Sequence, residues 1–229
     1  MKQILTLAVI SLMAVGCCGS PKTAQTKTDS TTMTQKAPFQ TKYTNADYYK
    51  DGVFQVDVAK KAYLEMFQHF NYPMTPFLEA NWWVADFGLG DFENCGMGGV
   101  FYVNDSVNGY FAHDIYLLPG QMIPEHKHVK TKFPAKVESW MVREGWAYNF
   151  SEIGEPTEGY EALIAQSQKA TTVSKNFVKQ EQGAIVNLAD KGVGTFHFLK
   201  GGDGGAIVHE WANYHDGTGL RFSNTKSVM

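Results

Sequence analysis

Apolar residues in the stretch "VDVAKKAYLEMFQHF" (residues 56–70) recur every three or four positions, which is the spacing of one face of a helix. Asp57 is a suitable N-cap, and Pro73 and Pro76 follow the stretch, where a helix has to end. The pattern therefore predicts one amphipathic helix ahead of the main body of the chain. His69 lies near its end and is typical of a surface or packing residue.

Beyond this helix the pattern changes to short segments that are rich in aromatic and β-branched residues. The segments "GGVFYVND" and "GYFAHDIYLLPG" flank the turn sequence "DSVNG", and together they predict a β-hairpin. The same pattern continues in four more segments, separated by clusters of Gly, Asp and Pro: "ESWMVREGWAYNF", "TTVSKNFVKQEQGAIVNL", "GTFHFLK" and "GAIVHEWANYH". Many short strands after one helix predict a mainly β, single-domain jelly roll or barrel.

The start of the chain, "MKQILTLAVISLMAVGC", has a charged residue, a short apolar run and small residues before a cysteine, as secretion signals do. It resembles a bacterial lipoprotein signal, in which residues 1–16 are removed and Cys17 becomes the lipidated first residue. An ordinary signal peptide cleaved nearby is the alternative. The lipoprotein reading implies secretion across the inner membrane of a bacterium and a lipid anchor in the cell envelope, facing the periplasm or the surface.

Residues 17–42 are rich in Thr, Ser, Lys and Gln, and their first aromatic residue is Phe39. Such a composition buries too little apolar surface to offset the entropy of ordering, so it predicts a flexible tether, with the folded domain at residues 43–229. Cys95 is the single cysteine of that domain, which leaves no partner for an internal disulfide. The formal net charge of −3 gives no sign of a nucleic-acid surface.

The most specific chemical pattern is "EHKHVKTKFPAKVE", which holds His126, His128 and Glu138. Residues two apart in a strand point to the same face, so the two imidazoles can share one ion. Two imidazoles and a carboxylate suit a divalent metal such as manganese, iron, zinc or nickel. Surface histidines beside a basic loop are the alternative for this pattern taken alone.

The surrounding residues resemble the first cupin motif, which combines a glycine, HxH, a glutamate and a second glycine. The matching positions are Gly120, His126, His128, Glu138 and Gly145. The segment "KGVGTFHFLKGG" resembles the second cupin motif, with His197 as a fourth ligand. The resemblance implies a cupin fold, a double-stranded β-helix, that holds one divalent metal. Manganese is the first candidate, and zinc, iron, nickel and cobalt are alternatives.

Further segments resemble the D-lyxose isomerase family, which comprises cupin-type sugar isomerases. Before the first motif the matching residues are Trp82, Val84, Asp86, Phe87 and Gly88, and Lys136 matches just before the motif glutamate. In "VHEWANYHDGTGLRF" the matching residues are Glu210, Asn213, Asp216, Arg221 and Phe222. The resemblance covers residues 77–225. It departs at the N-terminus, at Val129–Ala135 and between Asn213 and Arg221. The last two border the presumed pocket, so the sugar specificity of the family need not carry over.

The resemblance implies a metal-dependent isomerase that interconverts an aldose and a ketose through an enediol. The substrate would be a pentose or hexose such as D-lyxose or D-mannose. Because Glu138 would bind the metal, Glu210 is the candidate base, and Lys136 is the candidate partner of the negative charge that develops on oxygen. The implied substrate-binding residues are Trp82, Asp86, Asp216 and Arg221.

Each of these residues also has an ordinary structural alternative. Glu210 can pair with Arg221 or face solvent, Lys136 can be a solvated loop lysine, and Asp216 can belong to a turn. Trp82 or Trp83 can form a wall against the sugar, and either can equally be a core tryptophan.

Three other histidines lie in the same segments. His209 precedes Glu210 and should therefore face the opposite side of a strand. His113 can face the barrel, although the ligand set is complete without it. His215 can approach the mouth of the pocket beside Asp216.

A cupin fold does not fix a reaction. The alternatives to an isomerase are a metal-containing, sugar-binding lipoprotein without turnover and an iron cupin dioxygenase. The resemblance also implies a homodimer, because related cupins commonly pair.

Overall fold

The computed structural model describes residues 37–190 and 192–229. These residues belong to one compact unit, Ala37–Met229. The predicted signal peptide, the lipidation site at Cys17 and most of the predicted tether lie outside the described residues.

The compact unit begins at Ala37, whereas the sequence pattern placed the start of the domain at Tyr43. Phe39 is buried in a hydrophobic cluster of the domain, and the side-chain amide of Gln40 donates a hydrogen bond to the carbonyl of Asp203. One aromatic side chain therefore anchors residues whose composition otherwise resembles a linker.

The helix predicted from periodicity is present as α2, Val56–Phe70. Its buried residues are Ala59, Ala62, Tyr63, Met66 and Phe67, which lie on the predicted face. The helix starts earlier than predicted: Gln55 is the N-cap, and Asp57 lies in the first turn. There its carboxylate complements the helix dipole without capping the helix. Asn71 ends the helix in the left-handed conformation.

Three shorter helices were not predicted. They are α1 (Asn45–Tyr48), α3 (Pro76–Asn81) and α4 (Tyr160–Leu163). Thr75 is the N-cap of α3, and its side chain accepts a hydrogen bond from the amide of Leu78. Pro76 is the first residue of this helix, a position that suits its fixed φ. Two 3-10 turns, η1 (Leu188–Asp190) and η2 (Gly217–Gly219), complete the helical segments of the described residues.

The strands of the described residues form one small and one large antiparallel sheet. The small sheet pairs β1 (Tyr49–Lys50) with β2 (Val53–Phe54). The nine-stranded sheet contains β3 (Trp83–Ala85), β4 (Met97–Asp105), β5 (Tyr110–Leu117), β6 (His126–His128), β7 (Glu138–Ser151), β8 (Asn176–Gln180), β9 (Ile185–Asn187), β10 (His197–Ala212) and β11 (Leu220–Phe222).

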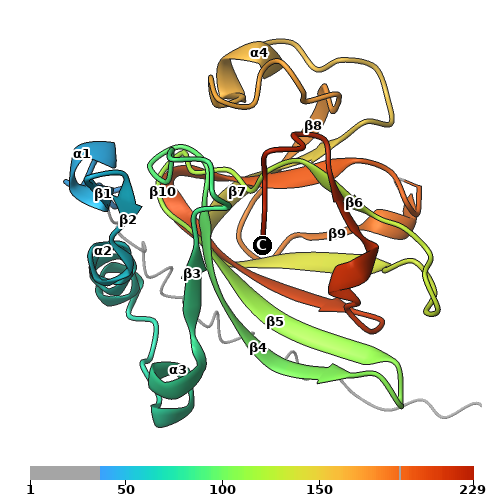
Figure 1. Ribbon diagram of the computed structural model, residues 1–229, viewed down its shortest axis with the longest axis horizontal. Coiled ribbons are helices and arrows are strands. Elements are labelled where there is room, and N and C mark those ends of the chain that lie inside the picture. The colour runs from blue at the N-terminus through green and yellow to red at the C-terminus, as the bar shows by residue number, and fades with distance from the viewer. Residues whose placement is uncertain (1–36, 191) are drawn as a thin grey trace, which may run out of the picture. The chain divides into compact units, whose positions relative to one another are not determined.

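The large sheet curls into a barrel (Figure 1). Its strand order is β11-β6-β10-β5-β4-β3, and β7 pairs with β10, β8 and β9. The prediction of a mainly β cupin fold is therefore confirmed. Two predicted strands, "GTFHFLK" and "GAIVHEWANYH", are one continuous strand, β10, which crosses the glycine-rich residues between them with a shift in register.

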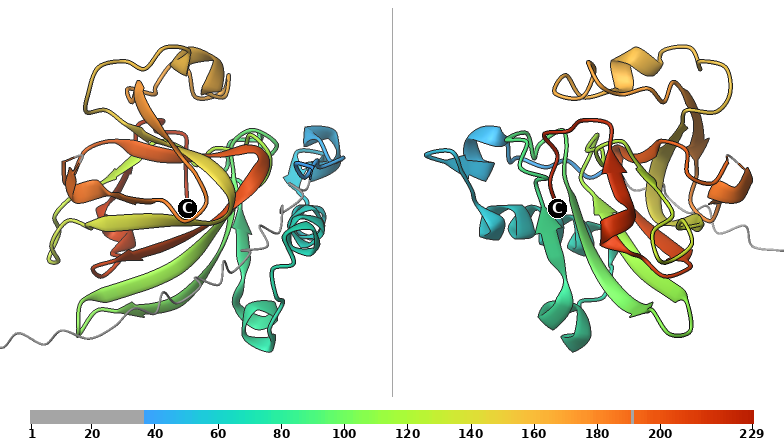
Figure 2. Two further views of the ribbon diagram at one scale, coloured as in Figure 1. Left: turned by 180° about the vertical axis from the view of Figure 1, so that it is seen from behind. Right: turned by 45° about the vertical axis from the view of Figure 1, so that its right-hand side comes forward.

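Two hydrophobic cores lie on opposite faces of the sheet. The paired residues Tyr116 and Ile207 face α2, whereas the next pair, Ile115 and Val208, faces the interior of the barrel. Helices α1–α3 lie together on one side of the curled sheet (Figure 1, Figure 2). In the described residues we find no helix long and apolar enough to cross a lipid bilayer.

Candidate active site

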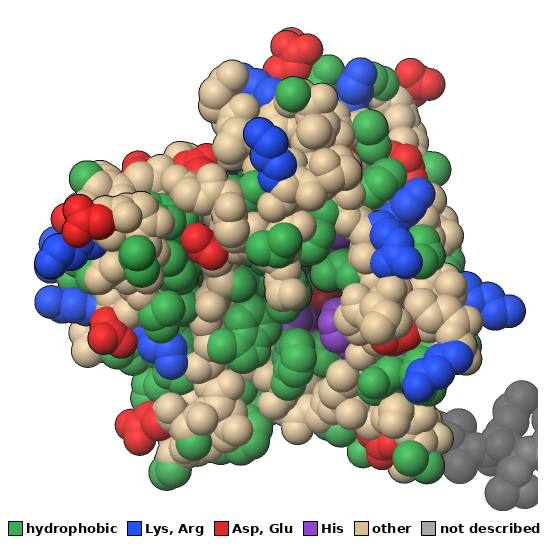
Figure 3. Space-filling view, in the orientation of Figure 1, with side chains coloured by type: hydrophobic (Ala, Val, Ile, Leu, Met, Phe, Trp, Pro, Cys, Tyr) green, Lys and Arg blue, Asp and Glu red, His purple; other side chains and the backbone are tan. Residues whose placement is uncertain are grey.

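A pocket occupies the interior of the barrel. Much of its wall is apolar, with contributions from Trp83, Phe101, Phe111, Trp140, Phe222 and Met229. The space-filling view shows histidine side chains at the bottom of a hollow on the face that carries the barrel mouth (Figure 3). A mostly apolar pocket with a few convergent polar groups is typical of a small-molecule site.

Three of the polar groups are the predicted histidines His126, His128 and His197. One nitrogen of each imidazole lies within 4.8 Å of the others, which is a spacing that can hold a metal ion. His126 and His128 are the ends of the short strand β6, and His197 is the register partner of His126 on β10. The barrel therefore brings together two motifs that are far apart in the sequence.

Hydrogen bonds to backbone carbonyls fix the orientation of two of these imidazoles. Nδ1 of His126 lies 2.9 Å from the carbonyl of Pro124, and Nδ1 of His197 lies 2.9 Å from the carbonyl of Thr195. A carbonyl only accepts, so Nδ1 donates in both rings, and in the neutral imidazole Nε2 is the nitrogen left to bind a metal. Such backbone support of the distal nitrogen is the usual arrangement behind a metal-binding histidine.

Glu138, the first residue of β7, completes the predicted set of ligands. Its Oε1 lies 2.9 Å from Nε2 of His128, and its Oε2 lies 3.0 Å from Nε2 of His197. These close contacts lack hydrogen-bond geometry, so the two Nε2 atoms and Oε2 of Glu138 are buried as ion-pair contacts without a hydrogen bond to a described residue. Close polar atoms that form no hydrogen bond need an explanation, and imidazole nitrogens converging with a carboxylate fit a divalent cation.

The electrostatics of the site suit metal binding. Burial by itself raises the pKa of the Glu138 carboxyl, but His128 and Lys136 outweigh burial and place its pKa well below the ordinary value. Burial, with the neighbouring His197 and His128, places the pKa of His126 well below its ordinary value. Glu138 is therefore an ionised carboxylate and His126 a neutral imidazole, which are the protonation states that metal ligands require.

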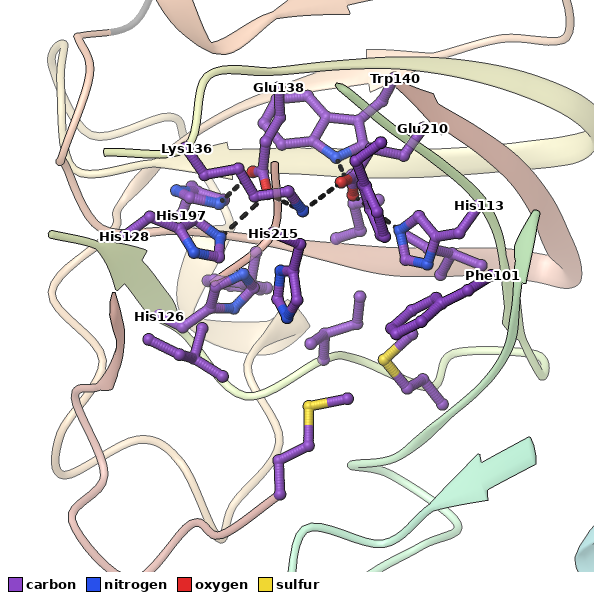
Figure 4. A pocket seen from close by; sticks show the side chains of 18 of the residues that line it. Phe101, His113, His126, His128, Lys136, Glu138, Trp140, His197, Glu210 and His215 are labelled. Atoms are coloured by element: carbon purple, nitrogen blue, oxygen red, sulfur yellow. Dashed lines mark hydrogen bonds and ion pairs between the residues drawn. The ribbon is translucent and has the colours of Figure 1, made fainter. Parts of the chain in front are cut away.

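A second carboxylate, Glu210 on β10, faces the same pocket (Figure 4). Lys136 joins the two carboxylates: its Nζ lies 2.6 Å from Oε1 of Glu138 and donates to Oε1 of Glu210. The other oxygen of Glu210 accepts a hydrogen bond of 3.1 Å from the indole of Trp140 and lies 3.0 Å from Nε2 of His113. The structure thus places the predicted base and the predicted lysine beside the predicted metal ligands.

The surroundings of Glu210 keep it ionised. Burial and the charge of Glu138 raise the pKa of the Glu210 carboxyl, but Lys136 and His113 outweigh them and lower it to about 2. Lys136 is also buried, which lowers its pKa, yet the two carboxylates raise it above its ordinary value. The site therefore contains two buried carboxylates with a buried ammonium between them, beside the predicted metal ligands.

Two residues around Glu210 were not assigned a role from the sequence. Trp140 stands two positions after Glu138 on β7, so strand periodicity places both side chains in the pocket and was a usable signal. His113 is the register partner of Glu210 on β5. Its role depends on strand pairing, which the sequence does not disclose. His209 lies on the outer face, as expected, where it pairs with Asp114.

The structure does not place Trp82 at the pocket. Trp82 ends α3, is 8% exposed and packs against Tyr63 and Phe67 in the core beneath the helices. Its neighbour Trp83, the first residue of β3, lines the pocket instead. Adjacent residues at the start of a strand face opposite ways, so the indole of Trp83 reaches the pocket and that of Trp82 reaches the core.

The other three predicted substrate-binding residues also lie away from the pocket wall. Asp86 accepts a hydrogen bond from the hydroxyl of Tyr49. Asp216 is the N-cap of η2, where it bonds with Thr218 and with the hydroxyl of Thr131.

Arg221 is exposed, and its guanidinium donates to the backbone carbonyls of Thr218 and Leu220. It stands between Leu220 and Phe222, which both line the pocket, so strand alternation turns it outward.

Sequence similarity links the chain to characterised sugar isomerases. The chain is 33% identical over 162 residues to the D-lyxose/D-mannose isomerase of Thermosediminibacter oceani, a match that covers 70% of this chain and 85% of that protein. It is 31% identical over 156 residues to the D-lyxose ketol-isomerase of Cohnella laeviribosi, covering 68% of this chain and 82% of that protein. No protein-family model matches the chain.

The fold is similar to that of two L-ribose isomerases. The enzyme of Acinetobacter sp. DL28 in complex with L-ribose superposes with a TM-score of 0.55 at 15% identity, over 75% of this chain and 92% of that chain. The enzyme of Cellulomonas parahominis gives a TM-score of 0.52 at 15% identity, over 74% of this chain and 90% of that chain. At this identity the likeness shows the shared fold alone, whereas the closer sequence similarity shows descent: the chain belongs to the D-lyxose isomerase family of sugar isomerases.

Proposed function

We propose that the chain is a metal-dependent aldose–ketose isomerase that acts on a pentose or hexose such as D-lyxose or D-mannose. The observation that carries the proposal is one buried pocket with a set of three histidines and a glutamate, a second carboxylate and a lysine between the two carboxylates. These are the groups that proton transfer between adjacent carbons requires. The family membership supports the same reaction class.

His126, His128, His197 and Glu138 would hold one divalent ion. We propose manganese first, with zinc, iron, nickel and cobalt as alternatives that the same nitrogen and oxygen ligands accept. When bound, the ion supplies Lewis-acid polarisation of the sugar carbonyl.

Glu210 is the proposed base. Glu138 is committed to the ligand set, whereas Oε2 of Glu210 is held only by the indole of Trp140 and the approach of His113. Glu210 would remove the proton from the carbon next to the carbonyl and return it to the neighbouring carbon of the enediol. Trp140 and His113 hold this carboxylate in place during both transfers.

Lys136 is the proposed partner of the charge that develops on oxygen. It is charged, buried and already beside both carboxylates, so it needs no reorganisation when the negative charge moves to the sugar. The aromatic wall of Phe101 and Phe111 shields the reacting atoms from water, which strengthens these interactions.

The proposal is tested by turnover with each divalent metal in turn. The purified, metal-loaded chain is incubated with D-lyxose, D-mannose and other aldoses, and the ketose product is measured. We expect isomerisation of at least one aldose, and we expect Glu210→Gln to abolish it while the metal content stays the same. Sugar binding without product would contradict the proposal and indicate a binding protein, and oxygen consumption by the iron-loaded chain would indicate a dioxygenase.

Two further proposals rest on the sequence and on the family resemblance. One is that the chain is lipid-anchored through Cys17 in the cell envelope of a bacterium, which predicts release into the soluble fraction for Cys17→Ser. The other is that the chain forms a homodimer, which light scattering of the purified protein measures.

A further inference from the structure

His215 lies in the pocket next to the metal-ligand histidines. It follows β10, and its ring is stacked on Phe111 with 5.4 Å between centroids and an angle of 26°. The ring centroid is 6.0 Å from that of Phe101 and 5.9 Å from that of His128. The close-up view shows the imidazole between the histidine cluster and Phe101 (Figure 4).

The backbone of His215 is fixed by a residue of the barrel. The amide of His215 donates to Oδ1 of Asn104 at 3.0 Å, and Nδ2 of Asn104 donates to the carbonyl of His215 at 3.0 Å. Asn104 belongs to β4, so the segment after β10 is fastened to the sheet at this point. The imidazole is therefore positioned in advance of any ligand.

The imidazole of His215 is incompletely bonded. Its Nδ1 is buried and has no hydrogen-bond partner among the described residues. A neutral imidazole offers one donor and one acceptor, and leaving such an atom without a partner is unfavourable until a ligand supplies one.

His215 lies in the segment between Asn213 and Arg221. Two nearby polar residues make their hydrogen bonds away from the pocket: Asp216 with the hydroxyl of Thr131, and Arg221 with a backbone carbonyl. His215 is thus the polar side chain that this segment contributes to the lining, beside the apolar rings of Phe101 and Phe111. A polar group placed among apolar side chains of a pocket is the kind of residue that sets the orientation of a ligand.

From this placement we propose that His215 is a substrate-recognition residue whose imidazole hydrogen-bonds to a sugar hydroxyl beyond the two reacting carbons. The proposal rests on the isomerase function proposed above and deepens it. A hydroxyl both donates and accepts, so it matches either ring nitrogen. The imidazole acts on binding and orientation and takes no part in the proton transfer, which belongs to Glu210.

The test compares His215→Phe with the wild-type chain and with Tyr214→Phe. Phenylalanine keeps the stacking on Phe111 and removes both nitrogens. Tyr214 is the adjacent residue and packs on Phe133 of the 129–135 loop, so its variant controls for disturbance of the segment. Steady-state rates are measured with the preferred aldose and with its 3-deoxy, 4-deoxy and 5-deoxy forms, and sugar affinity is measured separately by calorimetry with the non-reacting polyol of the same configuration.

We expect His215→Phe to raise KM and the polyol Kd by about five- to tenfold, with kcat changed less than about twofold, as for one lost neutral hydrogen bond. The penalty should disappear for the one deoxy sugar that lacks the recognised hydroxyl. Tyr214→Phe should match the wild type.

The inference is overturned if His215→Phe binds the polyol as tightly as the wild type, or if every deoxy sugar shows the same penalty. It is also overturned if the effect falls on kcat alone. If the wild type binds the polyol but turns over no sugar, the proposed isomerase function fails, while weaker polyol binding by His215→Phe still supports the recognition role.

Discussion

Replacing Lys136 with methionine removes the single cation between two buried carboxylates. Lys136 is 5% exposed, and Glu138 and Glu210 are 2% and 4% exposed. Methionine keeps most of the side-chain length and loses the charge, so in metal-free protein the two carboxylates would face each other in a low-dielectric pocket. Breaking a buried ion pair by removing one partner is strongly destabilising.

The loss in the free energy of unfolding caused by Lys136→Met has an upper limit, because one of the two carboxylates can take up a proton. Protonating an ordinary glutamate of pKa about 4.3 at about pH 7 costs roughly 3.7 kcal/mol at 1.36 kcal/mol per pH unit. We therefore expect Lys136→Met to lower the free energy of unfolding by about 3 kcal/mol near neutral pH. For a domain of this size, that corresponds to a fall in Tm of about 6–12 °C.

The difference in stability between Lys136→Met and the wild type should grow as the pH rises. In the wild type, the pKa of Lys136 is raised because the two carboxylates outweigh burial, so its stabilisation is present below the unfolded pKa of about 10.4 and is lost only above it. In the variant, the carboxylate that takes up a proton has a folded pKa above its unfolded value of about 4.3. Its protonated form stabilises at low pH, and this contribution is lost as pH rises. The variant should therefore be closest to the wild type at about pH 5 and furthest from it at about pH 8.

The assay is thermal unfolding followed by circular dichroism, with a chelator present, at several pH values between about 5 and 8. Lys132→Met is the matched control, because Lys132 is an exposed lysine of the same loop. The control should leave Tm within about 2 °C of the wild type. A Lys136→Met protein as stable as the wild type, or a loss of stability that does not depend on pH, would refute this account of the buried charges.

Three other substitutions test separate parts of the structure. His126→Ala removes a ligand of the proposed metal, and we expect the metal content measured by atomic emission to fall at least about tenfold after dialysis. Trp140→Phe removes the indole hydrogen bond to Glu210, so kcat should fall by about fivefold with little change in KM. Phe39→Ala opens a cavity at the start of the compact unit and should lower the free energy of unfolding by about 3 kcal/mol in a urea titration.

The sequence was informative where a short pattern has one structural solution. The spacing of apolar residues in α2 fits only a helix that packs on one face. The HxH pattern on a strand places His126 and His128 on one side whatever the rest of the barrel does. Lys136 and Glu210 were predicted as site residues from the family resemblance, and in the structure both lie beside the predicted metal ligands.

The sequence was uninformative where a role depends on strand pairing or on the direction of a single residue. His113 acquires a role only because β5 and β10 pair in the register that sets it beside Glu210. The choice between Trp82 and Trp83 depends on where α3 ends, and a shift of one residue at that point reverses the two side chains. Phe39 lies in a linker-like composition, and only the presence of a hydrophobic cluster to receive it shows that the domain starts there.

The central claim is that this pocket moves a proton between adjacent carbons of a sugar with the help of a bound metal. The most direct measurement is nuclear magnetic resonance of D-lyxose incubated in heavy water with the metal-loaded chain, the chelated chain and the metal-loaded Glu210→Gln variant. We predict a ketose product, and deuterium at the carbon next to the carbonyl, with the first sample alone. Unchanged sugar in all three samples, tested across the aldoses named above, or exchange that survives both chelation and Glu210→Gln, would contradict the account.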